Sequence, residues 1–162
     1  MGEPQRYSEL QFKRRSLQAF ADTVLKDGKK RGRYYRIGAI SAVVKRAMRK
    51  QGVKLLSQDL VITDDVILKY PHHPKASKGA TLEQSKYYVL DRIVRHPQHV
   101  YQDITSDKYF VFVFAGKHSN GRVIKAIVQP NKKIRGKTFN WLKSIGVVER
   151  RALNHIQYKK LK

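Results

Sequence analysis

Two adjacent histidines, His72 and His73, stand between Pro71 and Pro74 in the stretch ILKYPHHPKASKGATL. The unperturbed pKa of histidine is about 6.5, so its ring can both accept and donate a proton near neutral pH. A loop held by two prolines would fix a histidine at low entropic cost. These histidines are therefore candidates for general acid–base catalysis. The alternative is a rigid turn whose histidines point into solvent.

The residues of most other catalytic chemistries are absent or incomplete. The chain has no cysteine, which excludes disulfides, thiolate metal sites and a cysteine nucleophile. It also lacks the GxxxxGK(S/T), GxGxxG, GxSxG and HExxH motifs. His96 and His99 have a spacing that metal ligands use, but Pro97 lies between them. Asp64 and Asp65 could bind Mg²⁺, but few other acids are present to complete such a site. We expect no metal and no small-molecule cofactor.

Cleavage of RNA without a metal needs residue types that this chain has in quantity. The ribose 2′-OH is the nucleophile of that reaction. The protein must take up its proton, protonate the leaving 5′-oxygen and stabilise the charged phosphorane. His, Lys, Arg, Ser, Thr and Tyr side chains can perform these steps. The chain has 35 Lys and Arg residues against 12 Asp and Glu, which favours this chemistry over a carboxylate-based nuclease.

The net charge of +23 is unevenly distributed. Residues 1–54 carry 15 basic and 4 acidic residues, residues 55–107 carry 6 and 7, and residues 108–162 carry 14 and 1. Two basic ends around a nearly neutral middle are typical of a protein that presents positive surfaces to a polyanion. Nucleic acid, and RNA in particular, is the expected partner.

A membrane partner is disfavoured by the sequence. The basic residues are not collected on one long amphipathic helix, as acidic lipid would require. No apolar stretch is long enough to span a membrane, and the N-terminus MGEPQRYSELQFKRR lacks the apolar run of a signal peptide. We expect a soluble protein of the cytoplasm.

In the first half of the chain the sequence predicts helices joined by basic and extended segments. Apolar spacing predicts helices over residues 7–27, 38–50 and 82–95, the last ended by Pro97. The stretch DGKKRGRYYR reads as a basic loop, in which Tyr34 and Tyr35 either stack on bases or pack on the domain. LLSQDLVITDD reads as a short strand or extended segment.

The second half contains a β-hairpin. YFVFVFAG alternates aromatic and β-branched residues, HSNG is a turn signal, and RVIKAIVQ is a second strand closed by Pro130. NKKIRGK reads as a basic loop, and KTFNWL as a third strand or the start of a helix. Residues 147–161 are expected to form a last helix.

Basic residues in these loops, helices and strands are candidates for contact with phosphates, although each could also be a solvated side chain. The candidates are Lys29, Lys30, Arg31, Arg33, Arg36, Lys45, Arg49, Arg122, Lys132, Lys133, Arg135 and Lys137.

The order of these segments resembles that of a known family. An extended segment enters a histidine-containing loop (LVITDDVILKYPHHPK), a helix leads into DRIVRHPQHVYQD, the hairpin KYFVFVFAGKHSNGRVIKAIVQ follows, and a KTF element leads to the C-terminal segment. This pattern looks like the barnase–EndoU–colicin–RelE superfamily of metal-independent RNases, in particular its phage-encoded barnase-EndoU-like branch. The resemblance covers roughly residues 53–160.

The resemblance implies an α+β fold. N-terminal helices would pack on an antiparallel sheet of about four strands, with a C-terminal helix, and RNA would lie across the exposed sheet face. Residues 1–52 would form a basic helical segment beside an RNase-like domain of residues 53–162, in one compact unit. The implied catalytic residues are His72 or His73 as acid or base, Lys108, Lys117 and Lys125 as phosphate-stabilising cations, and Thr138 as the hydroxyl group.

Two functions follow from the sequence. The first is a metal-independent endoribonuclease, a toxin or an effector of a phage or mobile element, which leaves a 2′,3′-cyclic phosphate. The second is a non-catalytic, basic nucleic-acid-binding protein, such as a phage-encoded inhibitor or an RNA-associated factor. If the protein is a ribonuclease of this kind, a cognate inhibitor protein is a further possible partner.

Overall fold

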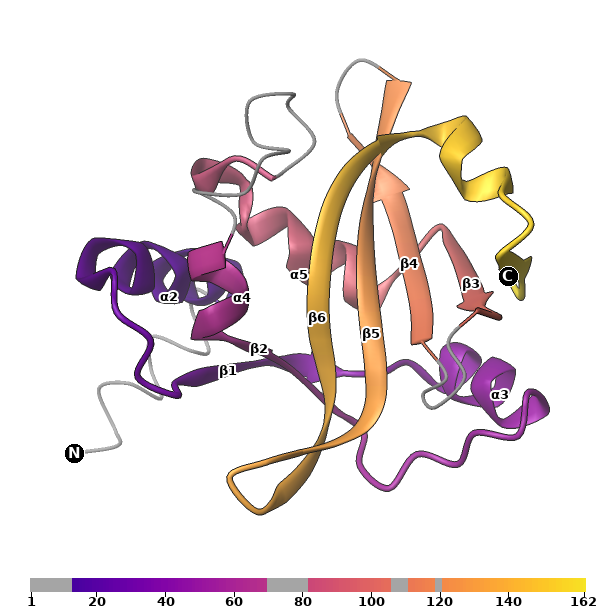
Figure 1. Cartoon of the computed structure of the whole chain (residues 1–162), viewed down its shortest axis with the longest axis horizontal. Helices are drawn as coiled ribbons and strands as arrows, with labels where there is room; N and C mark the ends of the chain where they lie inside the picture. The colour runs from indigo at the N-terminus through magenta and orange to yellow at the C-terminus, as the bar shows by residue number, and fades with distance from the viewer. Residues whose placement is uncertain (1–12, 70–81, 106–110, 119–120) are drawn as a thin grey trace.

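The computed structural model describes residues 13–69, 82–105, 111–118 and 121–162 (Figure 1). Its helices are α2 (Lys13–Asp27), α3 (Ala42–Lys50), α4 (Asp64–Lys69) and α5 (Tyr88–Arg95), with 3₁₀-helices η3 (Gln84–Lys86) and η5 (Arg150–Asn154). Its strands are β1 (Tyr34–Ala39), β2 (Asp59–Thr63), β3 (His99–Asp103), β4 (Val111–Lys117), β5 (Arg122–Ile134), β6 (Lys137–Glu149) and β7 (Tyr158–Lys160).

The strands form one mixed sheet in the order β1-β2-β6-β5-β4-β3-β7. Neighbours β2 and β6 are parallel, and the other neighbouring pairs are antiparallel. The expectation of an antiparallel sheet of about four strands is therefore wrong, because the sheet has seven strands and is mixed. The helices do not form an N-terminal layer either, since β1 and β2 lie between them in the sequence.

The expected C-terminal helix is also wrong. Residues 147–161 hold the end of β6, then η5, then the short edge strand β7, which pairs with β3. The β-branched pair Val147 and Val148 continues the ladder with β5, because such residues pack well on a pleated surface. Pairing with strands distant in sequence thus overrides the weak helical spacing of this segment.

Strand β1 occupies part of the stretch predicted as a basic loop. It pairs with β2 in an antiparallel ladder in which Tyr34 lies opposite Thr63 and Tyr35 opposite Ile62. Tyr35 packs on Phe20 of α2 with ring centroids 5.5 Å apart, whereas Tyr34 faces the other side of the sheet. The strand was not predicted because the many lysines and arginines of this stretch interrupt the alternation of apolar and polar residues that indicates a strand.

The main hydrophobic core lies between the helices and one face of the sheet, and Figure 1 shows α5 behind β4, β5 and β6. Its members include Leu17 of α2, Leu90 of α5, and Phe112 and Phe114 of β4. The helix predicted over residues 38–50 is confirmed from Ala42 onward as α3, whereas residues 38 and 39 belong to β1. Ser41 caps the first turn of α3 by accepting a hydrogen bond from the Val44 amide. None of the helices within the described ranges is long and apolar enough to cross a membrane.

The opposite face of the sheet, here called the open face, carries a smaller hydrophobic cluster. Tyr101, Val113, Ala115, Val123 and Leu153 form it. Of these residues only Leu153 comes from a helical segment, η5. The predicted hairpin is confirmed as β4 and β5, which pair from Phe112–Val128 to Lys117–Val123.

The β5–β6 hairpin projects beyond the rest of the sheet (Figure 1). Pro130 was predicted to end β5, but the strand continues to Ile134. The ladder is irregular between Gln129 and Lys132, so the missing proline N–H falls at a bulge. At the tip, Arg135 and Gly136 have positive φ angles of 51° and 80° and form a two-residue turn.

Two asparagines fix this hairpin to the segment before β2. The Asn131 side chain accepts a hydrogen bond from the Leu56 amide and donates one to the Lys54 carbonyl, both at 2.9 Å. The buried Asn140 side chain donates to the Ser57 carbonyl at 2.7 Å and accepts from the Asn131 amide at 3.3 Å. The direction of the hairpin is therefore set by four hydrogen bonds, of which the two made by the Asn140 side chain are partly buried.

Candidate nucleic-acid interface

The basic loop of residues 28–33 is anchored by a buried carboxylate. Asp64 Oδ2 accepts hydrogen bonds from the Arg31 amide at 2.7 Å, the Arg33 amide at 3.2 Å and Arg33 Nε at 3.3 Å. Burial raises the pKa of this carboxyl, but the hydrogen bonds outweigh burial, so the pKa lies below its usual range. Asp64 is thus engaged in holding the loop. The part of the chain that the structure describes holds no cluster of three or more metal-ligating side chains.

A second carboxylate, Asp27, holds the side chains of the same loop. Arg31 Nε donates to it at 2.6 Å and Arg33 Nη2 at 3.0 Å. The hydrogen bond from Arg31 is the largest cause that lowers the pKa of Asp27. Lys29 and Lys30 are exposed between these anchors. The loop therefore presents its lysines to solvent on a fixed backbone.

The loop meets the tip of the β5–β6 hairpin, although their sequences are about a hundred residues apart. Arg135 Nη2 donates to the Arg31 carbonyl at 3.1 Å. The Arg135 guanidinium also lies against Gly32, where an added Cβ would stand 2.8 Å from Nη2. This contact brings together eight cations, here called the basic strip: Lys29, Lys30, Arg31, Arg33, Lys132, Lys133, Arg135 and Lys137.

Aromatic side chains of the open face lie beside the basic strip. The rings of Tyr34 and Phe139 are 5.0 Å apart. Lys132 Nζ lies 5.4 Å from the ring centroid of Trp141, whose Nε1 donates to Thr63 Oγ1 at 2.9 Å. Tyr34 and Trp141 are half-buried, and Phe139 is buried. The basic strip and these three aromatic residues are here called the hairpin half of the open face; Lys132 and Lys137 lie on the same side of the hairpin as Phe139, whereas Lys133, opposite Thr138, lies on the other side.

A different group of side chains lies on the other part of the open face, near β7. Lys125 Nζ is 3.4 Å from the Tyr158 hydroxyl, and the rings of Tyr158 and Tyr101 are 6.2 Å apart. Burial, assisted by the charge of Asp103, raises the pKa of Tyr158. Burial also raises the pKa of Tyr101, against the opposing effect of Arg150. Both hydroxyls are therefore protonated at neutral pH. Lys117, Lys125, Tyr101 and Tyr158 are here called the β7 half.

The candidate catalytic residues separate into groups. Register places Lys117 opposite Val123 and Lys125 opposite Ala115, so the two lysines are diagonal neighbours on adjacent strands. Thr138 lies opposite Lys133 in the hairpin. Lys133 follows Lys125 by eight residues along β5, which corresponds to roughly 26 Å of strand. Thr138 therefore does not share a site with Lys125. His72, His73 and Lys108 lie outside the described residues.

The candidate phosphate-contacting residues also divide. Those of loop 28–33 and of the β5–β6 hairpin converge in the basic strip. Arg36 is paired with Asp59 at 2.7 Å on the neighbouring strand β2. Lys45 and Arg49 lie on α3, on the opposite side of the molecule from α2 in Figure 1. Arg122 begins β5, at the end remote from the hairpin tip.

Sequence reasoning missed several residues of both halves. Phe139 and Trp141 were not identified, although their i, i+2 spacing in KTFNWL already places them on one face of a strand. Tyr101 and Tyr158 were missed because they meet only through the pairing of β3 with β7, which no local pattern indicates.

No protein-family model, curated protein or solved structure matches this chain.

Proposed function

We propose that this protein binds single-stranded RNA along the hairpin half of the open face. The observation that carries the proposal is the contact of Arg135 with Arg31 and Gly32, which joins two distant basic segments into one strip. The strip has eight cations, and the carboxylates that contact them are Asp27 and Asp64. Both carboxylates are already bound to Arg31 and Arg33. The strip thus keeps a large excess of positive charge for phosphates.

The aromatic residues favour a single strand over a duplex. Tyr34 and Trp141 lie beside the cations of the strip and keep part of their surface exposed. Aromatic faces next to cations form a stacking platform for unpaired bases, which a duplex keeps stacked on each other. The choice of RNA over DNA rests on the resemblance to metal-independent RNases that the order of segments suggests.

The binding proposal is tested by fluorescence anisotropy with a labelled single-stranded RNA over a range of salt concentrations. A Lys132→Ala/Lys137→Ala variant removes two cations of the strip that lie on the same side of the hairpin as Phe139. Its log Kd should depend less steeply on log salt, by about 1.4 in slope, and its affinity at 0.15 M salt should fall about tenfold. The matched control, Lys45→Ala/Arg49→Ala, removes the same charge from α3. Equal losses in both variants would contradict a localised site.

We propose as a second function that bound RNA is cleaved at the β7 half. The supporting observation is the protonated Tyr158 hydroxyl beside Lys125, on the same face as Lys117. The 2′-oxygen would attack phosphorus while the bond from phosphorus to the 5′-oxygen breaks. Tyr158 would donate its proton to that oxygen. Uptake of the 2′-OH proton falls to His72 or His73 by the sequence-based expectation alone, since both lie outside the described residues. The two lysines would stabilise the phosphorane.

Incubation of the protein with total RNA in excess EDTA tests the cleavage proposal. Fragments should carry 2′,3′-cyclic phosphate at their 3′ ends, and they should disappear with a His72→Ala/His73→Ala variant. Retained binding in that variant would separate catalysis from affinity. Intact RNA with the wild-type protein would reject cleavage and leave the non-catalytic RNA-binding protein.

A further inference from the structure

A groove of about 310 Å³ lies between α3 and the segment that follows β7. Val43 and Ala47 line it from α3, and Leu161 lines it from the other side. Val43 is 47% exposed, although its side chain is aliphatic. Val44 and Met48, on the adjoining face of α3, are buried in the main core, and Leu161 packs against that core. The groove therefore lies on the helix side of the sheet, opposite the open face.

The residues of α3 that line the groove form two rows along the helix. Val43 and Ala47 are four residues apart and form an apolar row. Arg46 and Lys50 have the same spacing and form a basic row beside it. Each row repeats about every 6 Å, since a helix rises ~1.5 Å per residue. The groove thus has an apolar floor with cations along one edge.

The opposite rim of the groove adds another cation. Gln51 and Lys162 complete the lining. The Gln51 side-chain oxygen accepts a hydrogen bond from Lys159 Nζ at 3.0 Å, and Lys162 Nζ donates to the Pro97 carbonyl at 3.1 Å. Among the described residues no aspartate or glutamate lines the groove. Its charge is therefore positive on both sides.

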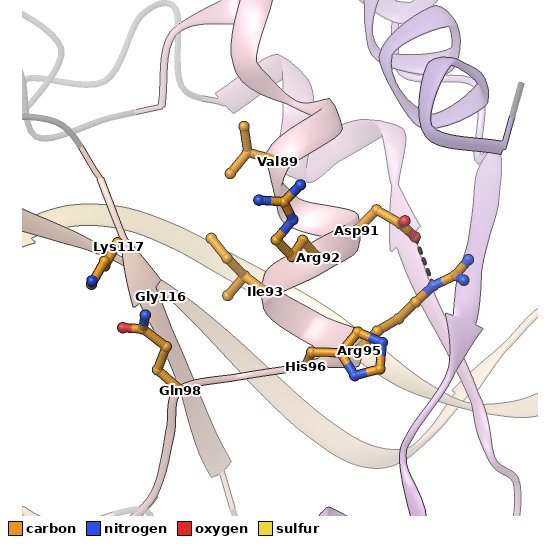
Figure 2. Close-up of a pocket in the computed structure, with 9 residues that line it drawn as sticks. All are labelled: Val89, Asp91, Arg92, Ile93, Arg95, His96, Gln98, Gly116 and Lys117. Atoms are coloured by element: carbon orange, nitrogen blue, oxygen red, sulfur yellow. Dashed lines mark ion pairs between the residues drawn. The ribbon is translucent and has the colours of Figure 1, made fainter.

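The cations of α3 are not compensated by the protein itself. On α5, by comparison, Arg95 is paired with Asp91, whose Oδ1 lies 2.8 Å from Arg95 Nε (Figure 2). Neither Arg46 nor Lys50 forms an ion pair within the described ranges, and both side chains are exposed. The positive charge along the groove therefore complements an acidic partner.

The chemistry of the groove favours a protein partner over a nucleic acid. Its apolar residues Val43, Ala47 and Leu161 are aliphatic, and no aromatic side chain lines it in the part of the chain that the structure describes. Surfaces that bind single-stranded nucleic acid combine cations with aromatic rings on which bases stack, as the hairpin half does. An aliphatic floor instead accommodates the aliphatic side chains of an amphipathic helix.

We propose that the groove binds an acidic amphipathic helix of a partner protein. Leucine-type residues of that helix would lie over Val43, Ala47 and Leu161, and its carboxylates would pair with Arg46 and Lys50. The two rows of α3 favour a helix, because residues four apart on a helix aligned with α3 repeat at the same spacing. The groove and the hairpin half lie on opposite sides of the sheet, so the partner would bind without displacing RNA.

Fluorescence anisotropy of the full chain with a labelled synthetic peptide tests the proposal. The peptide is an amphipathic helix with a leucine row and a glutamate row, each at i, i+4 spacing. One control peptide has glutamine in place of glutamate, and a second has alanine in place of leucine. At 0.15 M salt the acidic leucine peptide should bind at least about tenfold more tightly than either control peptide. Equal affinity for the three peptides would overturn the proposal.

Variants locate the peptide. Arg46→Glu/Lys50→Glu reverses the basic row, and Val43→Asp places a carboxylate in the apolar row, so each should weaken peptide binding about tenfold. The matched control, Lys45→Glu/Arg49→Glu, reverses the same charge on the same helix, but neither residue lines the groove. It should change the affinity less than about twofold, because salt screens its charges. Thermal unfolding verifies that each variant folds. Equal losses in the two double variants would contradict a site in the groove.

Addition of single-stranded RNA to the peptide complex decides between the two kinds of partner. The peptide should stay bound while RNA binds, because the two surfaces lie on opposite sides of the sheet. Displacement of the peptide by RNA would assign the groove to nucleic acid and overturn the proposal. The RNA-binding proposal itself is tested separately, through Lys132 and Lys137.

Discussion

The two halves of the open face differ in the kind of side chain they present. The hairpin half is dominated by lysine and arginine, which stay charged throughout the physiological pH range. In the β7 half the hydroxyl of Tyr158, which lies next to Lys125 and is protonated at neutral pH, accompanies the lysines. A surface of permanent charges can hold a polyanion, whereas chemistry also needs groups that give up a proton. The same sheet therefore carries the charges that would bind RNA and the groups that would take part in proton transfer at separate places.

The halves also differ in how the chain builds them. The hairpin half joins loop 28–33 to residues 132–141, and its geometry depends on the Arg135–Arg31 contact and on the anchor Asp64. The β7 half lies on neighbouring antiparallel strands and on β7, which adds to their edge. Variants that affect one half should leave the other intact, and the following predictions use this independence.

The largest effect is expected at Tyr158. Tyr158→Phe removes only the hydroxyl next to Lys125, so RNA cleavage should slow by about 10²- to 10⁴-fold, the usual contribution of a general acid. Affinity for RNA should stay unchanged, because the hairpin half is untouched. The measurement is the cleavage rate of a labelled RNA under saturating protein.

Tyr101→Phe is the matched control for that experiment, since Tyr101 lies next to Tyr158 and its hydroxyl has no role in the proposed reaction. It should cleave at nearly the wild-type rate. A Tyr158→Phe variant as active as wild type would remove the distinction between a binding half and a catalytic half.

The next effect concerns the anchor of the hairpin half. Asp64→Asn should lower the free energy of unfolding by about 1–3 kcal/mol at pH 7, because a buried carboxylate that accepts hydrogen bonds from Arg31 and Arg33 is lost. The pKa of Asp64 is lowered in the folded state. Its stabilisation is therefore present above the unfolded-state pKa of about 3.9 and is lost as the pH falls through the lower folded-state value.

Chemical denaturation of wild type and Asp64→Asn at pH 7 and near pH 3 measures this effect. The difference between the two proteins should shrink at the lower pH. A difference that is the same at both pH values would show that the carboxylate charge does not hold the loop.

The smallest effect is expected for base stacking. Tyr34→Leu keeps an apolar side chain against Phe139 but removes the exposed part of the ring. The binding free energy for single-stranded RNA should weaken by about 1 kcal/mol, or roughly fivefold in Kd. This is the low end of the range for base stacking, because Phe139 already covers part of the Tyr34 ring. Anisotropy titrations check it, and the salt dependence should stay as in wild type. A changed salt dependence would indicate that the strip itself had been disturbed.

Local sequence patterns predicted the elements whose signals are strong. The alternating aromatic and β-branched residues of β4 and β5 gave the correct hairpin, and the apolar spacing around Val44 and Met48 gave α3. Strand β1 was missed because Arg33 and Arg36 flank its tyrosines and suggest a solvated loop. The continuation of β5 past Pro130 was missed because a proline normally ends a strand, and only a bulge allows it.

Part of the candidate site was within reach of the sequence. The basic residues of loop 28–33 and of the hairpin were identified from their places in predicted loops and strands, and Lys125 from the resemblance to the RNase superfamily. Their grouping was not, because it depends on contacts such as Arg135 with Arg31 that only the strand order creates. For the same reason the separation of Thr138 from Lys125 could not be predicted from residue types.

The hydrogen bonds of Asn131 and Asn140 have a kinetic consequence. They fix the hairpin before any partner arrives, so little ordering of the protein accompanies complex formation. Encounter with RNA should then be fast and governed by long-range attraction, as expected for rigid, highly charged surfaces. Differences in affinity among variants of the aromatic residues should appear in how long the complex lasts rather than in how quickly it forms.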